Sequence, residues 1–124
     1  MNKKKKILVV EDDIDQAAMY QVALKAAGFT VIVARNGQEG IEVATSKKPD
    51  LIFLDMLLPD MDGLEVLKNL KSVDTTKSIK VIVLSNLNKQ EVINQSKKAG
   101  ADDFMIKMQL LPRDVVARAI ECLI

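Results

Sequence analysis

The sequence LIFLDMLLPDMDG at residues 51–63 gives the clearest indication of the fold of this chain. The stretch opens with four apolar residues that do not alternate with polar ones, a pattern typical of a parallel strand covered by helices on both faces. Asp55 ends the apolar run, and Asp62 lies three residues before Glu65, which is a pattern of helix capping. The segment therefore predicts a strand, an acidic loop and a helix that begins near Gly63.

The same order of strand and helix recurs along the whole chain. Further short apolar runs occupy residues 7–10, 31–34, 81–84 and 104–106. Further capping pairs are Asp13 with Gln16, Asn36 with Glu39 and Asn88 with Glu91. We expect helices over residues 14–27, 37–47, 63–71, 89–99 and 112–124. The alternation predicts an α/β domain in which helices cover both faces of a parallel sheet.

Two of the predicted helices carry apolar residues spaced for a single face. They are residues 18, 19, 22, 23 and 26 in the first helix and 115, 116, 119, 120 and 123 in the last. We expect both stripes to face the sheet, and we expect Cys122 to be a core residue. Gly28 and Gly100 follow predicted helices, where a left-handed cap would turn the chain.

The composition excludes several classes of function. The chain has 124 residues, and its 18 basic and 17 acidic side chains nearly cancel, so no overall field favours nucleic acid or an anionic membrane. Histidine is absent, which excludes Ser-His-Asp hydrolysis, zinc sites of the Cys/His type and a phosphohistidine carrier. Carboxylates, lysines and hydroxyls remain as the reactive groups.

The apolar segments are short throughout. The basic run Lys3 to Lys6 precedes only four apolar residues before Glu11, which is too short for a signal peptide. No apolar run approaches the roughly 20 residues that span a bilayer. The single Cys122 cannot form an internal disulfide, which suits a reducing compartment. We expect one domain over residues 1–124, located in the cytoplasm and not in a membrane.

Reactive side chains follow four of the predicted strands. They are Glu11, Asp12 and Asp13, then Asp55, Ser85 and Lys107. Because ligands of open α/β sheets bind at the carboxyl ends of the strands, we expect these side chains at one edge. Bringing Glu11, Asp12 and Asp55 together would raise their pKa values by mutual repulsion unless a cation lay among them, and an all-oxygen cluster suits Mg²⁺. Asp13 we interpret as a helix cap.

Three segments occur in a fixed order, VVEDD at residues 9–13, LIFLDMLLPDMDG at 51–63 and GADDFMIK at 100–107. The hydroxyl residue Ser85 follows the strand between the last two. Together they resemble the receiver domain of bacterial two-component response regulators, from about residue 6 to the end of the chain. The resemblance implies a flavodoxin-like (βα)5 doubly wound fold with strand order 2-1-3-4-5.

The resemblance also implies roles for individual residues. Asp55 would accept a phosphoryl group, Lys107 and Ser85 would contact it, and Ser85 with Phe104 would form the conformational switch. The ligands of Mg²⁺ would be Glu11, Asp12, Asp55 and the backbone carbonyl of Leu57. The chain would then phosphorylate and dephosphorylate itself without being a conventional turnover enzyme.

The partners implied by the resemblance are proteins. Because the chain has no histidine, the phosphoryl donor would be a sensor histidine kinase or a histidine phosphotransfer protein. The output would pass to a downstream protein or to a second copy through the face of the last two helices and the last strand, without direct contact with nucleic acid. Charged residues expected on that face are Lys97, Lys98, Asp102, Arg113, Arg118 and Glu121.

The sequence departs from the receiver pattern around the site. Most receivers have a proline where Met108 follows Lys107, and because a non-proline cis bond costs about 2.5 to 4 kcal/mol, we predict a trans bond here. Leu57 and Leu87 stand where receivers often have residues that influence hydrolysis of the phosphorylated aspartate. Because neither leucine can orient a water molecule, we predict slow loss of the phosphoryl group. Asn86, at a position often held by a small residue, would narrow the access to phosphorus.

Two alternatives remain open from the sequence, a degenerate receiver and a phosphatase, whereas a flavin-binding protein fails on charge. A degenerate receiver would bind partners without phosphorylation, and the altered loop after Lys107 supports it. A phosphatase of the haloacid dehalogenase type would require a second aspartate where Leu57 stands. A flavin-binding protein of the same fold would require a glycine- or hydroxyl-rich phosphate cradle in place of the acidic residues 11–13.

Overall fold

The computed structural model describes residues 4–87 and 89–124. Its strands are β1 (Lys6–Val10), β2 (Thr30–Ala34), β3 (Leu51–Leu54), β4 (Lys80–Ser85) and β5 (Asp103–Ile106). Its α-helices are α1 (Ile14–Ala26), α2 (Gly37–Lys47), α3 (Gly63–Ser72), α4 (Gln90–Lys98) and α5 (Pro112–Leu123). The bounds agree with the prediction to within one residue, whereas the short 3₁₀ helix η1 (Lys107–Gln109) was not predicted.

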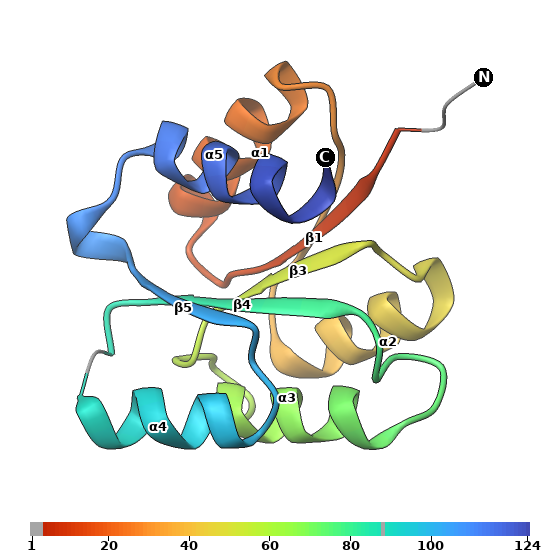
Figure 1. Cartoon of the computed structure of the whole chain (residues 1–124), viewed down its shortest axis with the longest axis vertical. Coiled ribbons are helices and arrows are strands. Elements are labelled where there is room, and N and C mark those ends of the chain that lie inside the picture. Colours follow the sequence, from red (N-terminus) through yellow and green to blue (C-terminus); the bar gives the residue numbers. More distant parts are fainter. Residues whose placement is uncertain (1–3, 88) are drawn as a thin grey trace.

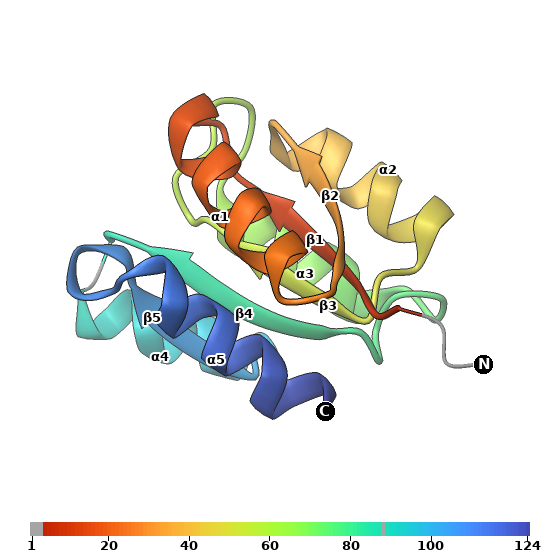
Figure 2. The same ribbon diagram turned by 90° about the horizontal axis from the view of Figure 1, so that it is seen from above.

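The five strands form one parallel sheet of order β2-β1-β3-β4-β5, as the resemblance implied. Helices α1 and α5 cover one face, and α2, α3 and α4 cover the other (Figure 1). Seen from above, β2 and β5 lie at the two edges of the sheet (Figure 2). Val10 is paired with both Ala34 and Leu54, so the central strands end together at the carboxyl edge.

Each face of the sheet has its own apolar core. Leu8 and Val10 point to the core beneath α2, α3 and α4, whereas Ile7 and Val9 point to the core beneath α1 and α5. Because successive side chains of a strand point to opposite faces, a run without polar residues is what a strand covered on both faces requires. Phe53 of β3 is likewise fully buried against α1 and α5.

The apolar stripe predicted for α1 is wrong. Val22 is 69% exposed and Met19 is 41% exposed, whereas the helix packs on the sheet through Ala17, Tyr20 and Leu24. The other predicted positions, Ala18 and Ala26, are exposed, and Ala23 is half-buried. Apolar residues occur almost all round this helix, so their spacing does not single out one face. Tyr20 joins the core because its ring is apolar although its tip is polar.

The stripe predicted for α5 is largely confirmed. Val115 and Ala119 are fully buried, and Val116 and Leu123 pack partly buried against the same core. Cys122 also packs against this core, but it is only half-buried. Ile120 is the exception, because it is 40% exposed.

Three helices are capped by the side chains predicted for them. The side chains of Asp13 and Asn36 accept hydrogen bonds from the N–H groups three residues ahead, at 3.0 and 2.8 Å. Asp62 caps α3 by accepting from Leu64 N. Gly28 and Gly100 have φ angles of 101° and 107°, which confirms two left-handed turns.

Two residues named from the sequence, Lys3 of the basic run and the predicted cap Asn88, lie outside the described residues. The helix that Asn88 was expected to cap begins at Gln90, after Lys89. In the part of the chain that the structure describes, no helix has the length and apolar character needed to cross a membrane.

Candidate functional site

The carboxyl edge of the sheet brings three acidic side chains together. Glu11 follows β1 and Asp55 follows β3, and the register of these neighbouring strands places the two side by side. The carboxylates of Glu11, Asp12 and Asp55 each offer an oxygen, and these oxygens lie within 4.8 Å of one another. Glu11 is 2% exposed and Asp55 is 6% exposed, whereas Asp12 is open to solvent. The cluster is therefore a half-enclosed acidic crevice.

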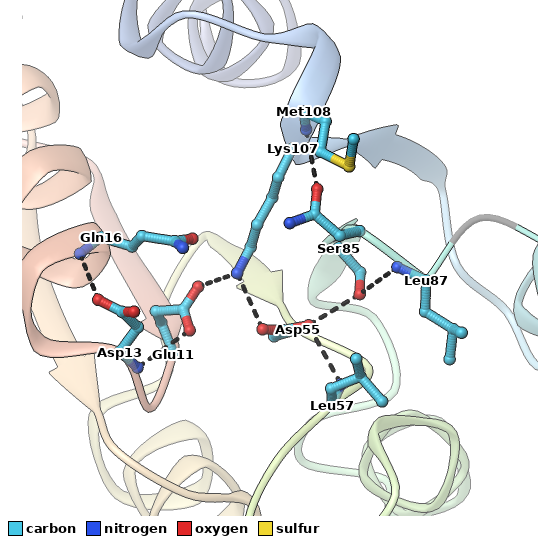
Figure 3. A network of polar contacts seen from close by, with 10 residues as sticks. Glu11, Asp13, Gln16, Asp55, Leu57, Ser85, Leu87, Lys107 and Met108 are labelled. Carbon is cyan, nitrogen blue, oxygen red and sulfur yellow. Dashed lines mark hydrogen bonds and ion pairs between the residues drawn. The ribbon is translucent and has the colours of Figure 1, made fainter.

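Lys107 extends into this crevice from the end of β5. Its ammonium contacts Glu11 Oε1 and lies 2.9 Å from Asp55 Oδ2 (Figure 3). The side chain of Lys107 is almost fully buried, like those of the two carboxylates that it contacts. A single lysine thus bridges both buried acidic groups.

Ser85 and Leu57 hold the other oxygen of Asp55. The buried hydroxyl of Ser85 donates to Asp55 Oδ1 at 2.8 Å, and the backbone N–H of Leu57 donates to the same oxygen at 3.1 Å. Ser85 Oγ in turn accepts from Leu87 N at 3.3 Å. The Asp55 carboxylate is therefore fixed by donors from three separate segments (Figure 3).

The electrostatics of the crevice reflect burial and pairing. Burial raises the pKa of the Glu11 carboxyl, and the Lys107 ammonium and the Asp13 N–H only partly offset this effect. Burial by itself would lower the pKa of Lys107, but its hydrogen bonds to Glu11 and Asp55 and the negative charges of these two groups together outweigh burial, so the pKa is raised. A cluster of three carboxylates with one ammonium retains net negative charge when ionised. Its oxygen-only donor set fits a hard divalent cation such as Mg²⁺.

The loop after Asp55 is anchored at two points. A Cβ atom on Gly63 would lie 2.4 Å from the carbonyl oxygen of Asp55, so only glycine lets α3 approach so closely. Asp60 accepts from Gly37 N at 2.7 Å and from Gln38 N at 2.9 Å, which ties the loop to the start of α2. These contacts hold the backbone around the Asp55 carboxylate in place.

The structure therefore brings together five of the six reactive side chains expected at the strand ends, namely Glu11, Asp12, Asp55, Ser85 and Lys107. Asp13 is a helix cap, as interpreted from the sequence. Phe104, expected to take part in the switch, is half-buried beside Val83 and packs against the core beneath α2, α3 and α4. The described residues include no cis peptide bond, so the prediction of a trans Lys107–Met108 bond is confirmed.

Sequence reasoning missed two contacts around the site. Lys107 was expected to contact a phosphoryl group, but its pairing with Glu11 was not foreseen. Asn86 Oδ1 accepts a hydrogen bond from Met108 N at 2.8 Å. The available signal was that a residue other than proline after Lys107 keeps an N–H to donate.

The charged residues expected on the α4, β5 and α5 face are partly engaged within the chain. Arg118 pairs with Asp103 of β5 at 2.8 Å and with Glu121 at 3.4 Å. Asp102 accepts from Val81 N and lies 3.8 Å from Lys71, so it braces the start of the neighbouring strand. Lys97, Lys98 and Arg113 are exposed.

The sheet order and the crevice define a doubly wound α/β domain with an acidic site at its switch point. The chain matches the family model of the response regulator receiver domain over residues 7–119, and it belongs to this family. This confirms the family that the three segments resembled.

Relatives of the chain match most of its length. The phosphate regulon transcriptional regulatory protein PhoB of Pseudomonas aeruginosa is 38% identical over 114 residues, which are 92% of this chain and 49% of PhoB. Sporulation initiation phosphotransferase F of Bacillus subtilis is 34% identical over 96 residues, 77% of this chain and 76% of that protein. The chain thus spans about half the length of PhoB and most of the phosphotransferase.

Solved structures show the same fold. Chemotaxis protein CheY4 of Vibrio cholerae has a TM-score of 0.90 at 26% identity, with 98% of this chain and all of that chain covered. The BeF3-activated receiver domain of Klebsiella pneumoniae RstA has a TM-score of 0.87 at 28% identity, with 96% and 98% covered.

Proposed function

We propose that this chain is the phosphoacceptor of a two-component phosphorelay and that Asp55 is the residue that takes the phosphoryl group. The observation that carries the proposal is the Asp55 carboxylate itself, which is buried at a strand end between a hydroxyl and an ammonium. A carboxylate fixed in this way is oriented for attack on phosphorus. Family membership favours this function over the phosphatase and flavin alternatives.

The transfer exchanges one bond to phosphorus for another. An oxygen of Asp55 forms the new bond, and the bond between phosphorus and an imidazole nitrogen of the donor breaks, so the donor histidine leaves. Lys107 lies beside the attacking carboxylate, where it neutralises charge that spreads over the transferred oxygens. Glu11, Asp12, Asp55 and the Leu57 carbonyl are the proposed ligands of Mg²⁺, which when bound supplies further neutralisation of that charge.

The proposed consequence of transfer is a change in the packing around Ser85. Ser85 already donates to Asp55, so its hydroxyl is placed to donate to a phosphoryl oxygen on the same residue. Phe104 lies one strand away, half-buried, where repacking would alter the α4, β5 and α5 face. This is a population shift biased by new charge-assisted contacts.

The proposed partners are proteins of the same pathway in the cytoplasm. A sensor histidine kinase or a histidine phosphotransfer protein would supply the phosphoryl group, and a downstream protein or a second copy would bind the α4, β5 and α5 face. The proposed unit is one receiver domain over residues 1–124.

The experiment is incubation of the full chain with acetyl phosphate and Mg²⁺, followed by intact-mass measurement. We expect the addition of one phosphoryl group, its loss in Asp55→Asn, and normal addition in the control Asp15→Asn, since Asp15 is an exposed carboxylate of α1. Omission of Mg²⁺ should suppress the addition. Absence of any addition to the intact protein would contradict the proposal and favour the degenerate receiver.

A further inference from the structure

Asn86 and Met108 lie on two neighbouring loops at the rim of the site. Asn86 follows Ser85, the last residue of β4, and Met108 follows Lys107, the first residue of η1. Asn86 Oδ1 accepts a hydrogen bond from Met108 N at 2.8 Å. Proline has no N–H to donate, so the bond requires a residue other than proline after Lys107. An amide side chain at one position and a free N–H at the other complement each other.

This hydrogen bond closes a ring around Asp55. Ser85 Oγ binds Asp55 Oδ1 at 2.8 Å, and Lys107 Nζ lies 2.9 Å from Asp55 Oδ2. Ser85 and Lys107 are each adjacent in sequence to one partner of the Asn86–Met108 bond. Both oxygens of the carboxylate are therefore held by loops that are themselves joined (Figure 3 shows Lys107, Met108, Ser85 and Asp55).

The other hydrogen bonds near Asn86 and Met108 either reach the carboxylates of the site or stay within one loop. Leu87 N donates to Ser85 Oγ at 3.3 Å, and Leu110 N donates to Lys107 O at 3.1 Å. Apart from the pairing of β4 with β5, the Asn86–Met108 bond is the one hydrogen bond that connects the two loops among residues 4–87 and 89–124. Beyond the end of the strand pairing, this bond is therefore the point at which a movement of one loop would act directly on the other.

We propose that Asn86 is a positioning residue. It makes the loop that follows Ser85 (the Ser85 loop) and the 3₁₀ turn that begins at Lys107 (the Lys107 turn) respond as one unit to modification of Asp55. The proposal rests on the proposed function for its consequence. When Ser85 moves toward a phosphoryl oxygen, the link carries the Lys107 turn with it and keeps the ammonium aligned with the transferred group. Without the link, the two loops would adopt their positions independently.

The first test needs no phosphorylation. Amide hydrogen exchange of Met108 is measured by NMR in the full chain and in Asn86→Ala, which lacks the acceptor. We expect exchange that is roughly two- to tenfold faster, the factor expected for loss of one hydrogen bond. Asn86→Asp keeps an acceptor oxygen and should keep the slow rate. Asn94→Ala is the matched control, because it also removes an exposed side-chain hydrogen bond, 2.9 Å from Gln90 to Asn94 in α4.

The second test measures the rate of phosphorylation by acetyl phosphate with Mg²⁺. Asn86→Ala should lower the rate by roughly two- to tenfold, and Asn86→Asp should restore it at least in part. In a Lys107→Ala background, Asn86→Ala should have no further effect, because the link acts through Lys107. A purely structural role would give the same fold-change in both backgrounds.

Two results overturn the proposal. One is unchanged exchange of the Met108 amide in Asn86→Ala, and the other is an equal effect of that substitution with and without Lys107. If the intact protein takes up no phosphoryl group, the proposed function fails, whereas the exchange at Met108 still decides whether Asn86 joins the two loops.

Discussion

The ammonium of Lys107 lies 2.9 Å from Asp55 Oδ2 and also contacts Glu11, so one cation compensates two buried carboxylates. The three residues come from the ends of β1, β3 and β5, and the fold alone brings them together. We therefore expect the stability of the crevice and its proposed chemistry to depend on the same side chain, Lys107.

Removal of the Lys107 charge should therefore destabilise the protein. In Lys107→Met the carboxylates of Glu11 and Asp55 remain buried without their partner, and we expect the free energy of unfolding in urea to fall by about 1 to 3 kcal/mol. Mg²⁺ should raise the unfolding midpoint more in the variant than in the intact protein, because the ion then supplies the missing charge. Lys98→Met, at an exposed position of α4, is the control and should stay within about 0.5 kcal/mol. Equal stability of the two variants would contradict this expectation.

Asp60 should make stability depend on pH in the acid range. Its hydrogen bonds from Gln38 N and Gly37 N lower the pKa of the Asp60 carboxyl below the usual value of 3.8. A lowered carboxyl pKa contributes stability above the unfolded-state pKa, and this contribution is lost as the pH falls through the folded-state pKa. Asp60→Ala should therefore lower the Tm at neutral pH, and its difference from the intact protein should shrink below pH 3.8.

The measurement is thermal unfolding by circular dichroism across the acid range. Asp74→Ala is a suitable control, since Asp74 pairs with Lys77 in a highly exposed contact. A Tm difference for Asp60→Ala that does not change with pH would show that the carboxylate charge is not involved.

Leu57 should slow the loss of the phosphoryl group from Asp55. Its side chain is 58% exposed beside the site and offers no group that orients a water molecule. Leu57→Asn supplies such a group, and we expect hydrolysis to accelerate roughly fivefold, the factor for one hydrogen bond of about 1 kcal/mol. The rate is followed by the decay of the intact-mass signal after removal of acetyl phosphate, with Leu57→Ala as the control for loss of bulk.

Leu87→Glu should act in the same direction, but it also disturbs a partly buried side chain, so its stability has to be measured alongside. Slower hydrolysis in Leu57→Asn or Leu87→Glu would count against the idea that the two leucines prolong the phosphorylated state.

The face of α1 that packs on the sheet can be tested by measurements of stability alone. Leu24 is fully buried, so Leu24→Ala should cost about 2 to 5 kcal/mol of unfolding free energy. Val22 is on the opposite, exposed side of the helix, so Val22→Ser should change the free energy of unfolding by no more than about 0.5 kcal/mol. Urea unfolding of the two variants decides between the observed face and the predicted one, which would give the reverse order.

Much of the fold could be predicted because its signals are local. Every strand was marked by a short apolar run, and the caps at Asp13, Asn36 and Asp62 use side chains that bond to backbone a few residues away. The face of α1 could not be predicted in the same way. Its sequence is apolar on several sides, and only contact with the sheet selects Tyr20 and Leu24 over Val22.

The parallel α/β sheet and the strand ends that carry the reactive residues could be predicted from local pattern, because strand periodicity and capping act over a few neighbouring residues. Only the tertiary structure shows which groups that are distant in the sequence lie in contact. Lys107 pairs with Glu11 across 96 positions, Asp60 caps a helix 22 and 23 positions away, and Asn86 joins Met108 across 22. The physical reason is that hydrogen bonds and ion pairs depend on distances of about 3 Å, which are set by the packing of whole elements and not by spacing along the chain.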